Sequence, residues 1–122
     1  MAQYEHLPVF KAIYDFNIYF HTLSRGFPKD VRYGLAGEVR TLASYVMNQV
    51  VLANTAAAKG PHLVRAETSL ELMKIKVRML RDLKAMKVSS YKYASSTLID
   101  ISKQIAAWKT WSENGRSKGR QT

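Results

Sequence analysis

The chain lacks cysteine altogether and has only three prolines and six glycines in 122 residues. Without cysteine it can form neither a disulfide nor a thiolate zinc site, and it has no cysteine nucleophile. No run of about 18 apolar residues is present, so we expect no membrane-spanning helix. The first residues lack the basic region and apolar run of a signal peptide, and the expected location is the cytoplasm.

Acidic residues are also scarce. The chain has 19 Lys and Arg against 9 Asp and Glu, which gives a formal charge of +10. This excess favours a polyanionic partner, either a nucleic acid or an anionic membrane surface. The length predicts a single domain with little room for a separate catalytic domain. Because 47% of the residues are hydrophobic, the composition is not that of a disordered chain.

Catalytic and metal-binding patterns are absent from the sequence. Three scattered histidines, His6, His21 and His62, have no metal-ligand spacing with one another. The chain has no Glu-x-x-His pair, no glycine-rich phosphate loop and no Gly-x-Ser-x-Gly elbow. Glu38 and Arg40 could be buried polar groups, but one carboxylate does not make an acid–base pair. We therefore expect no enzyme activity, no catalytic residue, no metal site and no cofactor.

Four segments carry apolar residues at helical spacing, and Gly and Pro separate them. The predicted helices cover residues 8–26 and 30–58, resume at residue 61, and end with residues 89–111. Four amphipathic helices with short connections predict an all-α fold, an antiparallel up-down-up-down four-helix bundle over residues 1–111. Residues 112–122 have no apolar face and are predicted to form a basic, flexible C-terminal tail.

Two glycines, Gly34 and Gly37, lie inside the second predicted helix. Each costs about 1 kcal/mol relative to Ala in a helix interior. Two explanations remain open at this stage. The segment could have low helix propensity, or another helix could approach the backbone closely there.

Positive charge concentrates in residues 59–92, which hold nine basic and three acidic residues. Lys74, Arg78 and Arg81 are predicted to lie along one edge of the third helix's apolar stripe. They would hold a nucleic acid through its phosphates, with an affinity that falls as salt rises. The alternative is an ordinary solvated flank. The candidate nucleic-acid-binding residues are Arg65, Lys74, Arg78, Arg81, Lys84, Lys87, Arg116, Lys118 and Arg120.

Intrahelical ion pairs are predicted to neutralise part of this charge. The expected pairs are Glu71 with Lys74 and Arg78 with Asp82, each worth about 0.2–0.5 kcal/mol. Two pairs leave most of the nine cations unneutralised. The opposite edge of the stripe is predicted to carry two further lysines, Lys76 and Lys87.

Two sets of residues fall outside the core stripes. The first set could stack on nucleobases or pack on half-buried helix flanks, and consists of Tyr33, Tyr45, Tyr91 and Tyr93. The second set does not fit one central seam and could face a neighbouring subunit, and consists of Ile18, Val51, Ile75, Met79 and Ile99.

Four segments, taken in order and spacing, resemble one protein family. They read YEHLPVFKAIYDF, GFPKDVRYGLAGEVR, SLELMKIKVRMLRDLKAMK and ISKQIAAWKTW. They resemble the accessory variability determinant proteins of diversity-generating retroelements. These belong with the four-helix-bundle proteins encoded in intervening sequences of large-subunit ribosomal RNA genes. The resemblance covers roughly residues 4–111.

This resemblance implies a basic, non-enzymatic subunit that assembles into a barrel-like homopentamer. It implies binding to the retroelement's reverse transcriptase and to RNA, and possible binding to DNA, in support of mutagenic reverse transcription. Lys74, Arg78 and Arg81 match basic positions of the family. The alternative is a four-helix-bundle scaffold of the ribosomal intervening-sequence type. A membrane-surface role is disfavoured, because the apolar stripes are needed for the bundle core.

Overall fold

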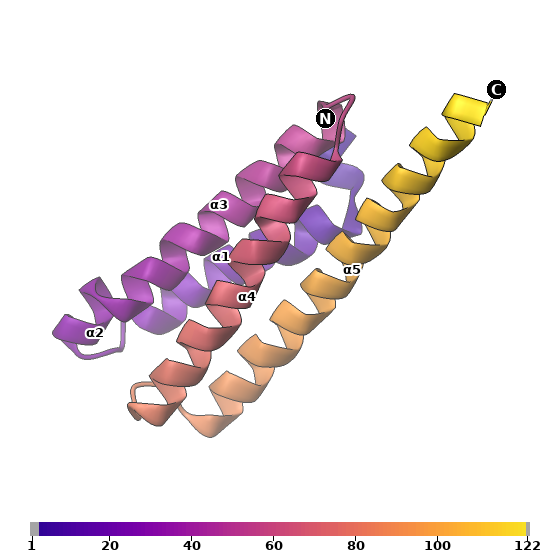
Figure 1. Ribbon diagram of the computed structural model, residues 1–122. Coiled ribbons are helices and arrows are strands. Elements are labelled where there is room, and N and C mark those ends of the chain that lie inside the picture. The colour runs from indigo at the N-terminus through magenta and orange to yellow at the C-terminus, as the bar shows by residue number, and fades with distance from the viewer. Residues whose placement is uncertain (1–2, 122) are drawn as a thin grey trace.

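The computed structural model describes the backbone of residues 3–121 and the side chains of residues 4–115. Its helices are η1 (Gln3–His6), α1 (Pro8–Ser24), α2 (Lys29–Tyr33), α3 (Leu35–Thr55), α4 (Gly60–Asp82) and α5 (Val88–Gln121). The four long helices pack together and run alternately up and down, as the sequence predicts (Figure 1). α1 packs against α3 and α5, and so does α4. α1 and α4 therefore occupy opposite corners of the bundle.

The predicted apolar stripes form the core. The stripe of α4 is fully buried and consists of Leu63, Ala66, Leu70, Met73, Val77 and Leu80. Ile13, Phe16 and Phe20 of α1 pack into the same core. The stripe of the second predicted helix is less regular, because the helix is broken between Val31 and Leu35 and both residues are only half-buried.

The break in the helix lies at Gly34, where the sequence predicts a continuous helix from Asp30. α2 ends at Tyr33 and α3 begins at Leu35, so the prediction of one helix is wrong. The backbone N–H of Gly34 donates to the carbonyl oxygen of Asp30 at 2.9 Å. A Cβ atom on Gly34 would lie 2.7 Å from that same oxygen. Residue 34 must therefore be glycine because a backbone carbonyl lies close to it. That carbonyl belongs to the preceding turn of the same segment and not to another helix.

Gly34→Ala is expected to lower the free energy of unfolding by about 1–3 kcal/mol, because the backbone must shift to relieve the contact. Chemical denaturation of both proteins measures this difference. Gly26→Ala is the matched control, since its Cβ would meet the Leu23 carbonyl oxygen at an ordinary 3.7 Å. Equal losses in the two variants would contradict a specific role for Gly34.

The connection between α4 and α5 is a Schellman turn. The N–H of Ala85 donates to the Leu80 carbonyl at 3.0 Å, and the N–H of Lys84 donates to the Arg81 carbonyl at 2.9 Å. Lys84 has a φ of 61°, in the left-handed region that glycine usually occupies in this motif. It is the one non-glycine residue with positive φ in the described backbone. The turn thus presents an exposed lysine at the end of the bundle.

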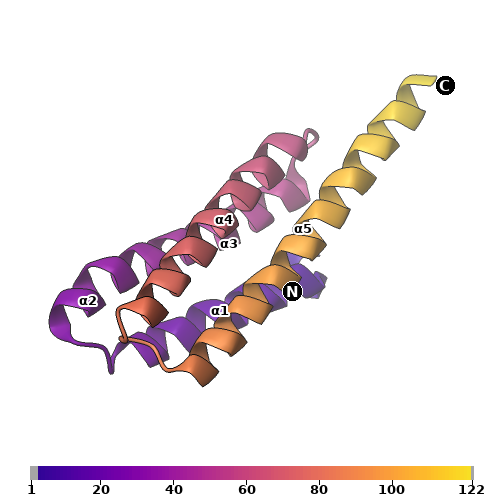
Figure 2. The same cartoon turned by 60° about the horizontal axis from the view of Figure 1, so that its bottom comes forward.

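α5 continues well past Trp111, where the sequence predicts the bundle to end. Its helical backbone extends to Gln121 and projects beyond the other helices (Figure 2). The missing apolar face does not end the helix, because the segment has no proline and Gly115 and Gly119 each cost only about 1 kcal/mol. The division of the chain at residue 111 stays a prediction.

Candidate nucleic-acid interface

Three of the predicted binding residues lie on the side of α4 that faces α5. The guanidinium of Arg81 sits 4.4 Å from the centroid of the Tyr91 ring of α5. At 100° per residue, Lys74 and Arg78 lie within about 60° of Arg81 around the helix axis. The Lys74 and Arg81 side chains are half-buried, and Arg78 is exposed. The predicted position at the edge of the core is confirmed for Lys74 and Arg81; their binding role stays a prediction.

Two of these three cations form ion pairs with carboxylates. Lys74 Nζ lies 2.8 Å from Glu71 Oε1, as predicted. Asp82 pairs with Arg81, not with Arg78, so the second predicted pair is wrong. Both Nε and Nη2 of Arg81 lie within 3.0 Å of Asp82 Oδ1, and the same guanidinium lies over the Tyr91 ring. Arg78 is left without an ion pair in the described part of the chain.

The other predicted residues lie elsewhere. Arg65 is exposed, thirteen residues before Arg78, which places it about 140° away around the axis and about 20 Å along it. α4 ends at Asp82, so Lys87 belongs to the connection and its predicted place on the helix edge is wrong. Lys84 is in the Schellman turn. The side chains of three predicted residues, Arg116, Lys118 and Arg120, lie outside the described residues.

Lys59, a member of the basic segment, has a structural role that the sequence did not reveal. Its Nζ donates to the carbonyl oxygens of Ala53, Asn54 and Ala56 at 2.8, 3.0 and 3.1 Å. These carbonyls at the end of α3 carry the negative pole of the helix dipole. Lys59 therefore caps α3 and has little capacity left for a phosphate.

Two connections bring further cations to one end of the bundle. The α1–α2 connection and α2 carry Arg25, Lys29 and Arg32, and they lie at the same end as the α4–α5 turn (Figures 1 and 2). We call this region, residues 25–33 together with 78–92, the turn end. Its two segments have net charges of +2 and +4, which is six of the ten net charges of the chain.

Sequence reasoning missed the contribution of residues 25–33. Acidic residues elsewhere in the first half of the chain mask it when charge is summed along the sequence. The predicted up-down-up-down topology could have revealed it, because the first and third connections of such a bundle lie at the same end.

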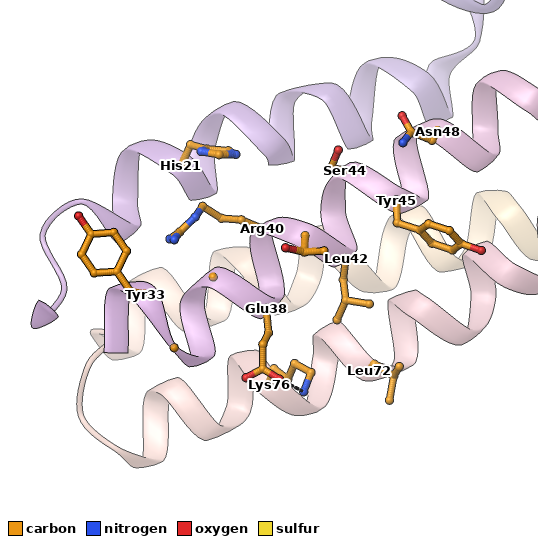
Figure 3. Close-up of a pocket in the computed structure, with 13 residues that line it drawn as sticks. His21, Tyr33, Glu38, Arg40, Leu42, Ser44, Tyr45, Asn48, Leu72 and Lys76 are labelled. Atoms are coloured by element: carbon orange, nitrogen blue, oxygen red, sulfur yellow. Dashed lines mark hydrogen bonds and ion pairs between the residues drawn. The ribbon is translucent and has the colours of Figure 1, made fainter. Parts of the chain in front are cut away.

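An open hollow of about 1030 Å³ lies on the outer face of α3 (Figure 3). Arg40 is half-buried there and donates to Ser24 Oγ at 2.8 Å and to the Arg32 carbonyl at 2.7 Å. Glu38 is exposed and pairs with Lys76 at 3.3 Å, so its predicted burial is wrong. The charged groups of the hollow thus already have protein partners, and Glu38 is the one carboxylate among its lining residues.

No group of three His, Cys, Asp or Glu residues in the described chain could hold a metal ion. Within the same residues, no helix has the length and apolar character needed to cross a membrane.

Comparison with family models identifies a family that the chain matches. A family model described as bAvd-like matches residues 9–111, which is most of the chain and covers α3 and α4, nearly all of α1 and the part of α5 up to Trp111. The search of curated proteins found none that matches.

Proposed function

The chain belongs to the bAvd-like family, and on that premise we propose that it binds both the reverse transcriptase and the template RNA of a diversity-generating retroelement. Family membership implies an accessory protein of such an element, and this family is non-catalytic. In the proposed role the protein supports mutagenic reverse transcription by holding RNA near the polymerase. It does so without a catalytic residue or cofactor of its own.

The observation that carries RNA binding is the charge of the turn end. Its exposed cations without an ion pair among the described residues are Arg25, Lys29, Arg78, Lys84, Lys87 and Lys92. Cations free of carboxylates can exchange their counterions for phosphates without first breaking an ion pair. Contacts of this kind position RNA and do not read its sequence.

The first test measures the affinity of the full-length protein for template RNA as salt rises from about 50 to 200 mM. Six phosphate contacts on single-stranded RNA would lower the association constant by roughly 300-fold over this range. An affinity that does not change with salt would contradict electrostatic binding.

Recovery of the reverse transcriptase with the tagged protein after nuclease treatment tests the second partner. Loss of the polymerase on that treatment would mean that RNA alone connects the two proteins.

We also propose a homopentameric ring, which two exposed apolar patches support. The α4 patch lies on the outer face of that helix, where four side chains are 43–47% exposed: Val64, Leu72, Ile75 and Met79. Tyr14 and Ile18 form the α1 patch at the opposite corner, at 48% and 56% exposure. Two different patches on opposite corners suit head-to-tail contacts, which close into rings. Val51 is half-buried, so its predicted exposure to a neighbour is not supported.

A further inference from the structure

The first two turns of α5 combine aromatic and basic residues in the order Tyr91-Lys92-Tyr93. At 100° per residue these three side chains spread over about 200° of the helix surface, with Lys92 in the middle. Tyr91 lies toward α4, where it contacts Arg81, and Tyr93 lies toward α1, where it contacts Tyr19. Lys92 is exposed between them. A cation therefore stands between two planar groups at the turn end.

Tyr93 is a supported but open aromatic surface. Its ring centroid lies 4.7 Å from that of Tyr19, and 55% of the residue is exposed. Tyr19 is fixed in turn, because its hydroxyl donates to the Ser90 carbonyl at 3.3 Å. Burial raises the pKa of Tyr19, so this hydroxyl, already protonated at neutral pH, remains a donor at higher pH as well. The Tyr93 ring is thus held in place before any ligand arrives.

The second planar group is the guanidinium of Arg81, which lies over the Tyr91 ring. The Arg81 side chain is 36% exposed, so part of it faces solvent. Guanidinium planes and aromatic rings both stack on nucleobases when those bases are unpaired. In a duplex the base faces already stack on one another, and only backbone and groove edges are open to a protein.

We propose that this part of the turn end binds unpaired nucleotides, with a base stacked on Tyr93 and phosphates held by Lys92 and Lys87. This inference rests on the proposed RNA binding and assigns it a substrate class, single-stranded over double-stranded nucleic acid. The Arg81–Tyr91 pair provides a second stacking surface on the other side of Lys92.

The test uses the full-length protein and a short, fluorescently labelled RNA strand, alone or annealed to its complement. Anisotropy titrations give both affinities for wild type, Tyr93→Leu, Tyr93→Phe and Lys92→Gln. Tyr45→Leu and Lys103→Gln are the matched controls, an exposed tyrosine on α3 and an exposed lysine farther along α5. Thermal unfolding shows whether each variant retains the wild-type fold.

We expect Tyr93→Leu to weaken single-strand binding roughly 5- to 100-fold, to leave duplex binding unchanged and to keep the salt dependence. Tyr93→Phe keeps wild-type affinity, because it keeps the ring. Lys92→Gln lowers the slope of log affinity against log salt by about 0.7. Equal effects of Tyr93→Leu on strand and duplex, or no effect on either, would overturn the inference while RNA binding stands. A wild-type protein that binds neither probe would overturn the proposed RNA binding as well.

Discussion

The variant Ile75→Asp/Met79→Asp is expected to be a monomer of 13.9 kDa in light scattering, whereas the wild-type protein, as the proposed pentamer, is expected to have the mass of five copies, about 70 kDa. Both side chains lie on the exposed face of α4 and are about 45% exposed, so the change leaves the bundle core intact. In the ring, each aspartate would be buried against a neighbour without a partner for its charge, at a cost of about 3–5 kcal/mol. Two such costs weaken association by roughly 10³-fold or more.

The α1 patch gives a sharper test of the head-to-tail arrangement. Tyr14→Asp/Ile18→Asp should also be monomeric, because it removes the other half of each contact. An equimolar mixture of the two double variants should form a dimer of about 28 kDa, since each retains the patch that the other lacks. If α4 pairs with α4, Tyr14→Asp/Ile18→Asp dimerises alone, and the head-to-tail model is wrong. A monomeric wild-type protein would exclude the pentamer.

Reversing three unpaired cations, Arg78→Glu/Lys84→Glu/Lys87→Glu, is expected to weaken binding to template RNA on the order of 10²-fold or more. All three side chains are exposed and lack a carboxylate partner in the described chain, so the loss falls on binding and not on folding. Filter binding at fixed salt measures the affinity. Circular dichroism checks that the helical content is unchanged.

The control for this variant removes cations that already have partners. Lys11→Gln/Lys109→Gln takes away two lysines that pair with Asp15 and Glu67 at 2.7 and 2.9 Å. It lowers the net charge, but we expect less than a tenfold loss in RNA affinity, because these lysines already bind carboxylates and are less available to phosphates. The same two proteins also test the scaffold alternative. RNA binding that persists in the triple variant while polymerase binding is lost would favour a scaffold over an RNA-binding subunit.

Much of the fold could be predicted from helical periodicity. Apolar residues three and four positions apart must share a helix face, and a small protein can hide such faces only against one another. The α4 stripe from Leu63 to Leu80 is buried throughout for this reason. The family could also be predicted, because four segments in a fixed order carry more information than any one of them.

Other features depend on atoms that periodicity does not describe. The break at Gly34 is decided by the distance from its Cβ position to the Asp30 carbonyl. Asp82 pairs with Arg81, whose guanidinium also contacts Tyr91 of α5, and helical spacing within α4 gives no sign of that contact. Charge counted along the chain also missed half of the turn end, because residues 25–33 are distant in sequence from residues 78–92 and lie at the same end of the bundle only in the folded chain.

Lys84 adds a positive charge to the turn end but lowers the stability of the fold. A non-glycine residue in the left-handed conformation costs roughly 1 kcal/mol or more, so glycine would be the stabilising choice at this turn. The same substitution would remove an exposed cation from the turn end. Under the proposed RNA binding, glycine at this position would raise the melting temperature and lower the affinity for RNA, so stability and binding would place opposite demands on residue 84.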